Sequence, residues 1–314
     1  MSETVADLEA VQAELDHVQR EIGKRIVGQE SVVEAVLTCM LCDGNALIEG
    51  NPGLAKTLLV RTIAEVIDLD FSRIQNTPDL MPSDITGTEV LQESADSREF
   101  VFQPGPIFAN IVLADEINRA TPKTQAALLE AMEEHQVTAG GETHRLPDPF
   151  FVLATQNPID QEGTYPLPEA QSDRFLLKIL IDFPSFDEEI EIVDRYTRAL
   201  DPSPDVERVM DRERLIEIQR MVREVPIAND IRDRAVEIVA ETRSADAIDF
   251  GASPRASLAL VLTAKARALL AGRAHVSEAD LEAMAKPVLR HRIILDFTAE
   301  RDGLHPDDVN EQLL

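Results

Sequence analysis

Two short segments of the chain carry residue types that could bind and cleave a phosphate group. The first, GNPGLAKT at residues 50–57, follows the apolar run Ala46–Ile48 and opens a stretch with helical spacing. Glycines there would let backbone N–H groups close around phosphate oxygens, and the helix N-terminus adds partial positive charge. Lys56 would reach the β- and γ-phosphates, and Thr57 would bind Mg²⁺. The residues expected to contact a nucleotide here are Asn51, Pro52, Gly53, Leu54, Ala55, Lys56, Thr57 and Leu58.

Ala55 departs from the general phosphate-loop pattern, which has its second glycine before the lysine. Alanine accepts a helical backbone but disfavours a positive φ. We therefore expect the backbone to be helical already at Ala55. A coincidental turn is the alternative interpretation of the whole run, and the strand before it and the helix after it argue against that.

The second segment is IVLADE at residues 111–116, an apolar run that ends in two carboxylates. A buried strand with this ending places both carboxylates at the ligand-binding edge of a sheet. Asp115 would hold Mg²⁺ through water, and Glu116 would orient the attacking water. An acidic loop end is the alternative, but the combination with a phosphate loop favours a hydrolytic site.

The elements that must position these residues alternate between strand and helix from residue 45 to residue 181. Two helical stretches are Thr57–Ile67 and Pro122–Glu134, the second with Thr121 placed to cap it. This alternation predicts an α/β fold with a mostly parallel sheet that binds ligands at the carboxyl ends of its strands. The five predicted strands are Ala46–Ile48, Phe71–Ile74, Ile111–Ala114, Phe150–Ala154 and Phe175–Ile181.

The connection between the second and third strands is too long for an ordinary loop. Within it Glu99–Phe102 alternates like a strand, so residues 79–108 are expected to form an insert with a projecting hairpin. The N-terminal segment predicts an amphipathic helix, which should pack on its own domain rather than form a coiled coil. Its apolar positions are Leu8, Val11, Leu15, Val18 and Ile22.

The chain changes character after Pro184, where no further strand is expected. Helices are predicted at residues 186–199, 211–223, 229–243, 254–271 and 278–290. Ser277 and Asp280 form a capping box at the start of the last one. The sequence therefore predicts two domains, an α/β domain over 1–183 and an all-α domain over 184–314.

The composition is that of an acidic globular protein. The 314 residues are 44% hydrophobic and 28% charged, with a formal net charge of −28. Such an excess of acid favours solubility in concentrated salt, and we hypothesise a salt-adapted host. A melting temperature that rises with KCl is expected, and one that is highest in low salt would contradict it. The same charge disfavours long-range attraction to DNA.

Several other classes are disfavoured. No run approaches the roughly 18 apolar residues of a membrane span, and the acidic start lacks the order of a secretory signal. We expect a cytoplasmic protein without a membrane partner. Cys39 and Cys42 form a C-x-x-C pair without further ligands nearby, and they are interpreted as buried apolar side chains rather than a redox or metal site.

Longer motifs resemble a known family. The runs GNPGLAKT, QPGPIFANIVLADEINRATPKTQAALLEAMEE, ATQNP and GASPRA are similar to the MoxR group of AAA+ ATPases, and the likeness extends from Ile26 to Arg292. The resemblance implies a P-loop NTPase (AAA+) core with a five-stranded parallel sheet, followed by an all-α lid domain. Alanine before the P-loop lysine is common in that group. The resemblance also implies Mg-dependent hydrolysis of ATP to ADP and phosphate by a hexameric ring.

Two polar residues gain roles from this resemblance. Asn157 matches the sensor asparagine that hydrogen-bonds the γ-phosphate or the attacking water. Arg174 matches the arginine finger, which reaches the γ-phosphate held by the neighbouring subunit. The alternatives are a turn residue before Pro158 for Asn157 and a salt bridge for Arg174. Asn118 and Arg119 are distinctive in the family motif, but no role follows for them.

Three further positions follow from the same resemblance. Arg255 matches the second sensor, and it stands at a helix start where the dipole disfavours a cation. Because Ser253 suits the helix cap and Pro254 suits the first turn, an anion is expected beside Arg255, namely the nucleotide's γ-phosphate, with a solvated side chain as the alternative. Val27 and Gly28 belong to the segment that flanks the adenine.

The leading functional hypothesis is a chaperone-like ATPase that remodels or matures protein clients, often together with a von Willebrand A-domain partner. A DNA motor or a chelatase-type motor subunit is one alternative, disfavoured by the acidic surface. A nucleotide-locked scaffold that binds ATP without turnover is the other. A pure binder has no need of Glu116, which argues against the scaffold.

Overall fold

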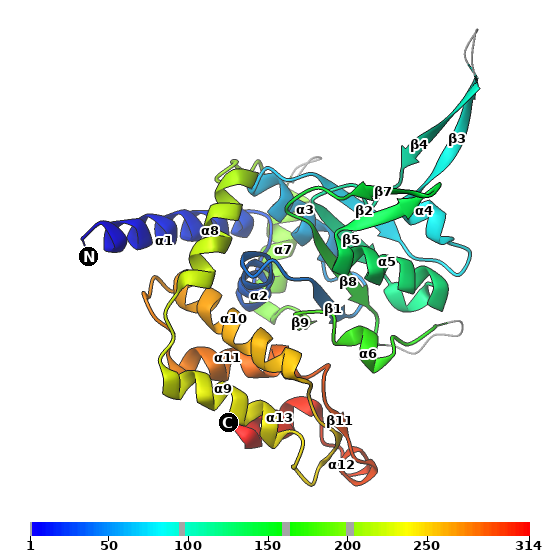
Figure 1. Cartoon of the computed structure of the whole chain (residues 1–314). Helices are drawn as coiled ribbons and strands as arrows, with labels where there is room; N and C mark the ends of the chain where they lie inside the picture. The colour runs from blue at the N-terminus through cyan, green and yellow to red at the C-terminus, as the bar shows by residue number, and fades with distance from the viewer. Residues whose placement is uncertain (1, 94–97, 159–163, 199–203) are drawn as a thin grey trace.

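The computed structural model describes residues 2–93, 98–158, 164–198 and 204–314. At its centre lies a five-stranded parallel sheet in the order β2-β5-β8-β1-β9, surrounded by helices (Figure 1). The predicted parallel sheet is confirmed, and the main difference is a last strand that begins at Leu177 rather than Phe175. Its strands are β1 (Ala46–Gly50), β2 (Phe71–Gln75), β5 (Ile111–Asp115), β8 (Phe151–Gln156) and β9 (Leu177–Ile181).

Helices cover both faces of this sheet because successive strand residues point to opposite sides. Leu113 of β5 belongs to one apolar cluster together with Leu59 of α3, whereas the adjacent Val112 belongs to a second cluster together with Met132 of α5. The helical elements of this domain are α1 (Ser2–Gly23), α2 (Glu30–Leu41), α3 (Lys56–Val66), α4 (Pro82–Thr86), a 3₁₀ turn (Ile117–Arg119), α5 (Pro122–Glu134) and α6 (Glu169–Ser172).

The N-terminal helix packs on its own chain, as predicted. Val11, Leu15, Val18 and Ile22 are buried, and α1 contacts both α3 and the later helix α10. The helix therefore packs against the sheet part of the chain through α3 and against the helical part through α10. No helix in the described part of the chain has both the length and the apolar character needed to cross a membrane.

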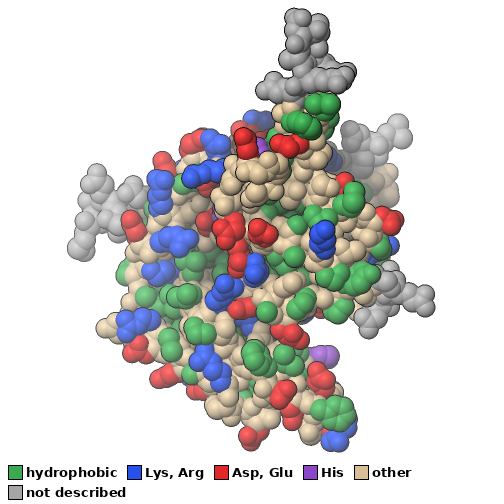
Figure 2. Space-filling view, turned by 45° about the vertical axis from the view of Figure 1, so that its right-hand side comes forward, with side chains coloured by type: hydrophobic (Ala, Val, Ile, Leu, Met, Phe, Trp, Pro, Cys, Tyr) green, Lys and Arg blue, Asp and Glu red, His purple; other side chains and the backbone are tan. Residues whose placement is uncertain are grey.

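The predicted insert forms a two-stranded antiparallel hairpin that projects from the body (Figure 1). Its strands are β3 (Gly87–Glu93) and β4 (Arg98–Pro104), with Val90 opposite Val101. Phe102 anchors its base by stacking on His144, with ring centroids 3.8 Å apart. Further out, four apolar side chains are exposed, and hydrophobic atoms are visible on the hairpin in Figure 2. They are Val90, Leu91, Phe100 and Val101.

A second hairpin in this domain is missing from the sequence prediction. It consists of β6 (Gln136–Ala139) and β7 (Glu142–Arg145), paired antiparallel around Gly140 and Gly141. Both glycines have positive φ, 59° and 86°. A Gly-Gly pair between two short β-type runs is a hairpin signal, so the sequence did carry the information.

The C-terminal part is mainly helical, and the five predicted helices are confirmed with small shifts of their ends. The expectation of no strand after Pro184 is wrong, because residues 248–250 pair with residues 294–295. Strands of two and three residues are too short to show an alternating pattern. The elements are α7 (Phe186–Thr197), α8 (Arg212–Glu224), α9 (Asn229–Glu241), β10 (Ile248–Phe250), α10 (Pro254–Leu270), α11 (Glu278–Leu289), β11 (Ile294–Leu295), α12 (Phe297–Arg301) and α13 (Pro306–Leu313).

Asp280 is a fully buried charge in this helical part. Its carboxylate accepts hydrogen bonds from Arg267 at 2.8 Å, from Arg273 at 2.5 Å and from the backbone N–H of Ser277 at 2.9 Å. Burial alone would raise the pKa of Asp280, but these hydrogen bonds outweigh burial and hold the pKa well below its usual range. The predicted capping box is thus also the centre of a buried ion-pair network that joins α10 to α11.

Replacing Asp280 with asparagine is expected to lower the free energy of unfolding by about 3–5 kcal/mol, because two guanidinium groups lose their buried partner. The pKa of Asp280 is depressed in the folded state, so its stabilisation is present above the unfolded pKa, about 4, and is lost as the pH falls through and below that value. Urea unfolding at pH 7 and pH 3 measures both effects. Glu282→Gln, at an exposed position of the same helix, is the control, and equal stability of the two variants would contradict the expectation.

The two cysteines are buried and unpaired, as expected. Burial raises the pKa of both thiols above the ordinary value. Both side chains contribute to the larger apolar cluster, and the Cys42 thiol donates to the carbonyl oxygen of Leu262 at 3.5 Å. These observations support the interpretation of Cys39 and Cys42 as core residues.

Candidate nucleotide-binding site

The sheet order brings the two chemically interesting segments together. Strand β8 lies between β1 and β5, so the loop after β1 and the carboxyl ends of β5 and β8 share one edge. A cavity of about 390 Å³ lies at that edge. Its lining residues are Pro52, Gly53, Leu54, Ala55, Lys56, Thr57, Leu58, Arg73, Gln75, Asp115, Glu116, Thr155, Gln156 and Asn157.

The glycine-rich loop turns through two positions with positive φ. Gly53 has φ 89°, and Ala55 has φ 54° and ψ 20°, a left-handed conformation at the N-cap of α3. The expectation of a helical backbone at Ala55 is therefore wrong, and the helix begins one residue later, at Lys56. A left-handed alanine costs about 1–2 kcal/mol, which the loop accepts because the chain must reverse direction between β1 and α3.

Lys56 is held at the mouth of this loop by backbone carbonyl groups. Its ammonium Nζ donates to the carbonyl oxygen of Gly50 at 2.5 Å and to that of Asn51 at 3.2 Å. Burial lowers the pKa of Lys56, and the nearby carboxylates of Asp115 and Glu116 oppose this effect. The ammonium group is therefore partly desolvated and faces the cavity edge where the two carboxylates lie.

Asp115 is fixed on both of its oxygen atoms. Thr155 donates its hydroxyl to Oδ1 at 2.6 Å, and the Arg73 guanidinium contacts Oδ2 at 2.6 Å. The carbonyl oxygen of Asp115 accepts from the Asn76 side chain at 2.8 Å. The Asp115 carboxylate thus borders the cavity, and the Arg73 guanidinium already balances its negative charge. A divalent ion bound there would neutralise the same charge.

Glu116 has a strained backbone and two polar partners. Its φ of 54° and ψ of 53° are left-handed, which is uncommon outside glycine. Its N–H donates to the Thr155 hydroxyl at 2.8 Å, and Oε2 accepts from Gln75 at 3.3 Å and from Arg119 at 2.8 Å. The sequence left Arg119 without a role, and the structure places it on the Glu116 carboxylate. Strain of this kind persists only where the surroundings fix it, and it often marks a functional position.

Arg73 and Gln75 are site residues that the sequence analysis missed. Both lie on β2, which pairs with β5 so that Gln75 stands opposite Asp115. Residues two apart on a strand share one face, so Arg73 reaches the Asp115 carboxylate and Gln75 reaches the neighbouring Glu116 carboxylate. Nothing local in the run FSRIQ indicates this position, because it depends on which strand lies next to β5.

Several predicted residues lie outside the cavity lining. Val27 is buried, and Gly28 lies so close to the Glu188 carboxylate of α7 that a Cβ atom there would collide with it. Arg174 and Arg255 both contact Glu133 near the end of α5. The structure therefore brings together the loop, Asp115, Glu116 and Asn157, and it separates the two arginines from them.

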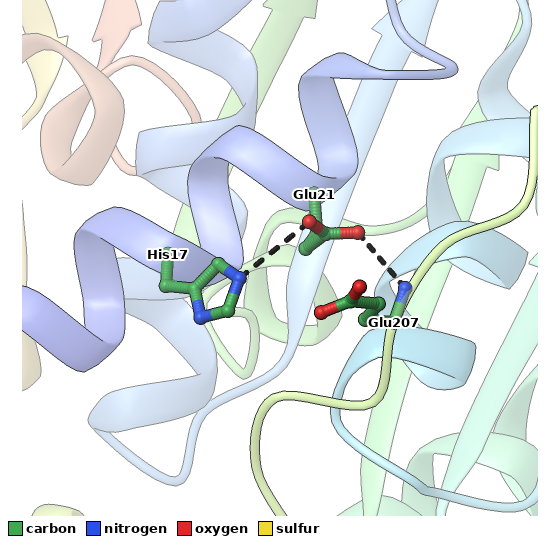
Figure 3. Close-up of side chains that lie close together, drawn as sticks. All are labelled: His17, Glu21 and Glu207. Carbon is green, nitrogen blue, oxygen red and sulfur yellow. Dashed lines mark hydrogen bonds and ion pairs between the residues drawn. The ribbon is translucent and has the colours of Figure 1, made fainter.

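Thr57 and Asp115, the predicted Mg²⁺ ligands, both border the cavity. A second set of possible ligands consists of His17, Glu21 and Glu207, whose ligand atoms lie within 4.8 Å of one another (Figure 3). Glu21 is already engaged there, by His17 at 3.5 Å, by the Lys24 ammonium at 2.6 Å and by the Glu207 N–H at 2.8 Å. The Glu207 N–H, followed by Lys24, lowers the pKa of Glu21. This set fastens α1 to the segment that precedes α8.

The parallel sheet, the glycine-rich loop and the paired carboxylates define a P-loop nucleotide-binding domain followed by a helical lid. The chain matches the ATPase family associated with various cellular activities (AAA) over residues 45–177 and the AAA lid domain over residues 240–313. It is 42% identical over 318 residues to Chaperone MoxR1 of Mycobacterium tuberculosis, covering 98% of this chain and 83% of that protein.

Two further relatives span almost the whole chain. Identity to the uncharacterized protein YeaC of Bacillus subtilis is 45% over 293 residues, covering 93% of this chain and 91% of that protein. The crystal structure of a candidate ATPase from Cytophaga hutchinsonii matches with a TM-score of 0.92 and 39% identity, covering 99% of this chain and 96% of that chain. The chain belongs to the MoxR group of AAA+ ATPases, as the sequence motifs predicted.

Proposed function

We propose that this protein hydrolyses ATP to ADP and phosphate with Mg²⁺, as a ring whose subunits share their active sites, and that it remodels protein partners. The observation that carries the proposal is the meeting of Lys56, Asp115 and Glu116 at one cavity beside the P-loop. A loop that only binds phosphate does not require a strained carboxylate beside it. This disfavours the nucleotide-locked scaffold.

Each residue at the cavity has a chemical task in this proposal. Backbone N–H groups of residues 53–57 and the Lys56 ammonium bind the β- and γ-phosphates. Thr57 and Asp115 would hold Mg²⁺, which neutralises charge on the phosphate oxygens when it is bound. Glu116 accepts a hydrogen bond from the attacking water and orients it toward the γ-phosphate, and Asn157 hydrogen-bonds that water or the γ-phosphate.

The placement of the two arginines supports shared sites. Arg174 and Arg255 do not line the cavity that contains their own subunit's Lys56. Both are on the surface beside Glu133, where a neighbouring subunit could present its nucleotide. In the proposed ring, of six subunits by family resemblance, they supply positive charge to the neighbour's γ-phosphate.

Protein clients are favoured over DNA by two observations. The chain carries a formal net charge of −28, which repels a phosphate backbone. The projecting hairpin exposes Val90, Leu91, Phe100 and Val101, which suit apolar contact with a protein surface. A relative named Chaperone MoxR1 agrees with this choice. A von Willebrand A-domain protein is the partner that the family resemblance suggests.

The first experiment measures ATP turnover per subunit across protein concentration, with Mg²⁺ or with EDTA, in high KCl. We expect Mg-dependent turnover that rises steeply with concentration, because assembly completes the sites. Turnover that is independent of concentration in a protein shown to be monomeric by sizing would contradict shared sites. Tight ATP binding without turnover, even with candidate partner proteins added, would favour the scaffold.

A further inference from the structure

One carboxylate, Glu133, holds both arginines that lie outside the nucleotide cavity. The Arg174 guanidinium contacts Oε2 of Glu133 at 2.6 Å, and the Arg255 guanidinium contacts Oε1 at 3.3 Å. Arg174 precedes β9 of the sheet domain, whereas Arg255 is in the first turn of α10 in the lid. Glu133 therefore joins two arginines from different domains into one cluster.

A second set of contacts fixes the same junction. The Ser253 hydroxyl, which caps α10, donates to Oδ2 of Asp173 at 2.9 Å, and the buried Arg292 donates to Oδ1 at 2.8 Å. Asp173 is the residue before Arg174. Asp173 thus links the chain next to Arg174 to the cap of α10, and Glu133 contacts the guanidinium groups of both Arg174 and Arg255.

The Glu133 contacts are accessible to an incoming anion. The side chains of Arg174, Glu133 and Arg255 are 31%, 35% and 56% exposed. Arg174 and Glu133 also line a surface cavity of about 490 Å³, with Glu130 and Glu134 nearby. Neither of these two glutamates forms an ion pair with a described residue. Of the three carboxylates, Glu133 is therefore the one that pairs with Arg174 and Arg255.

Resting on the proposed function, we propose that Glu133 is a positioning residue that restrains Arg174 and Arg255 until a neighbour's γ-phosphate replaces it. One carboxylate carries a single negative charge for two cations, so a more highly charged phosphate group competes for them. ADP has no γ-phosphate, and the arginines then stay with Glu133. Glu133 in this way makes subunit assembly depend on which nucleotide the neighbour holds.

The test measures assembly of the full chain by sedimentation across protein concentration, with Mg²⁺ and either ADP or AMP-PNP. Glu133→Gln removes the charge without changing the shape of the side chain. We expect it to lower the midpoint concentration of assembly about three- to tenfold in AMP-PNP, and much less in ADP. Glu134→Gln is the matched control, since it removes the same charge at the next residue.

Four results would separate the possible failures. Equal midpoints for Glu133→Gln and Glu134→Gln would overturn the role of Glu133, and so would an equal shift in ADP and AMP-PNP. A wild-type chain that shows no difference between the nucleotides, together with an Arg174→Ala variant of full turnover, would overturn the shared sites themselves. A loss of turnover in Arg174→Ala without any Glu133→Gln effect leaves the proposed function standing and removes only this inference.

Discussion

Replacing Glu116 with glutamine is expected to reduce ATP turnover at least about a hundredfold while leaving nucleotide affinity nearly unchanged. Glutamine keeps the size of the side chain and its hydrogen bond from Arg119, but it cannot accept a proton from the attacking water. The backbone N–H of Glu116 still donates to the Thr155 hydroxyl, so the local turn is preserved. The change therefore removes the proposed action of Glu116 on the attacking water and leaves the phosphate-binding groups intact.

Single-turnover hydrolysis and a nucleotide-binding titration measure the two quantities separately. A large loss of affinity would mean that Glu116 supports the loop rather than the attacking water. Full turnover in Glu116→Gln would assign the orientation of water to another group. Gln75→Ala is a milder change for comparison. Gln75, on β2, donates to Oε2 of Glu116, so its loss should reduce turnover less than the loss of the carboxylate itself.

The sheet and the P-loop could be predicted because their signals are local. Strands buried on both faces read as continuous apolar runs, and IVLAD at residues 111–115 is wholly of that kind up to its terminal aspartate. Pro122–Glu134 was predicted to the residue, since Thr121 caps the helix with its hydroxyl at 3.4 Å from the Thr124 nitrogen. Charged residues that follow such strands lie at the carboxyl edge of the sheet, where ligands bind, whatever the order of the strands.

The remaining features depend on contacts between distant parts of the chain. Arg73 reaches Asp115 only because β2 pairs with β5, and no property of its own segment reveals that order. The left-handed backbone at Ala55 is set by the path of the loop, which overrides the preference of alanine. Arg255 was expected beside the nucleotide's γ-phosphate, whereas in the folded chain its guanidinium contacts Glu133, from a helix more than a hundred residues earlier.

Replacing Arg174 with alanine is expected to lower turnover about 10³-fold, with ATP binding retained, because the neighbour's γ-phosphate loses its arginine. Turnover at saturating ATP and a binding titration measure this. Arg208→Ala is the control, since Arg208 is an exposed arginine whose ion pair is with Asp68 rather than with Glu133. A turnover that matches the control would contradict the role of Arg174.

Mixing two inactive variants decides whether Arg174 acts between subunits. A subunit with Arg174→Ala keeps Glu116, and a subunit with Glu116→Gln keeps Arg174. In a ring of head-to-tail contacts, an equal mixture restores complete sites wherever the first binds nucleotide next to the second, which is about a quarter of the interfaces. Turnover should therefore recover on mixing to a substantial fraction of wild type. An arginine that acted within its own subunit could not be complemented in this way, because every site in the mixture would still lack either Glu116 or Arg174.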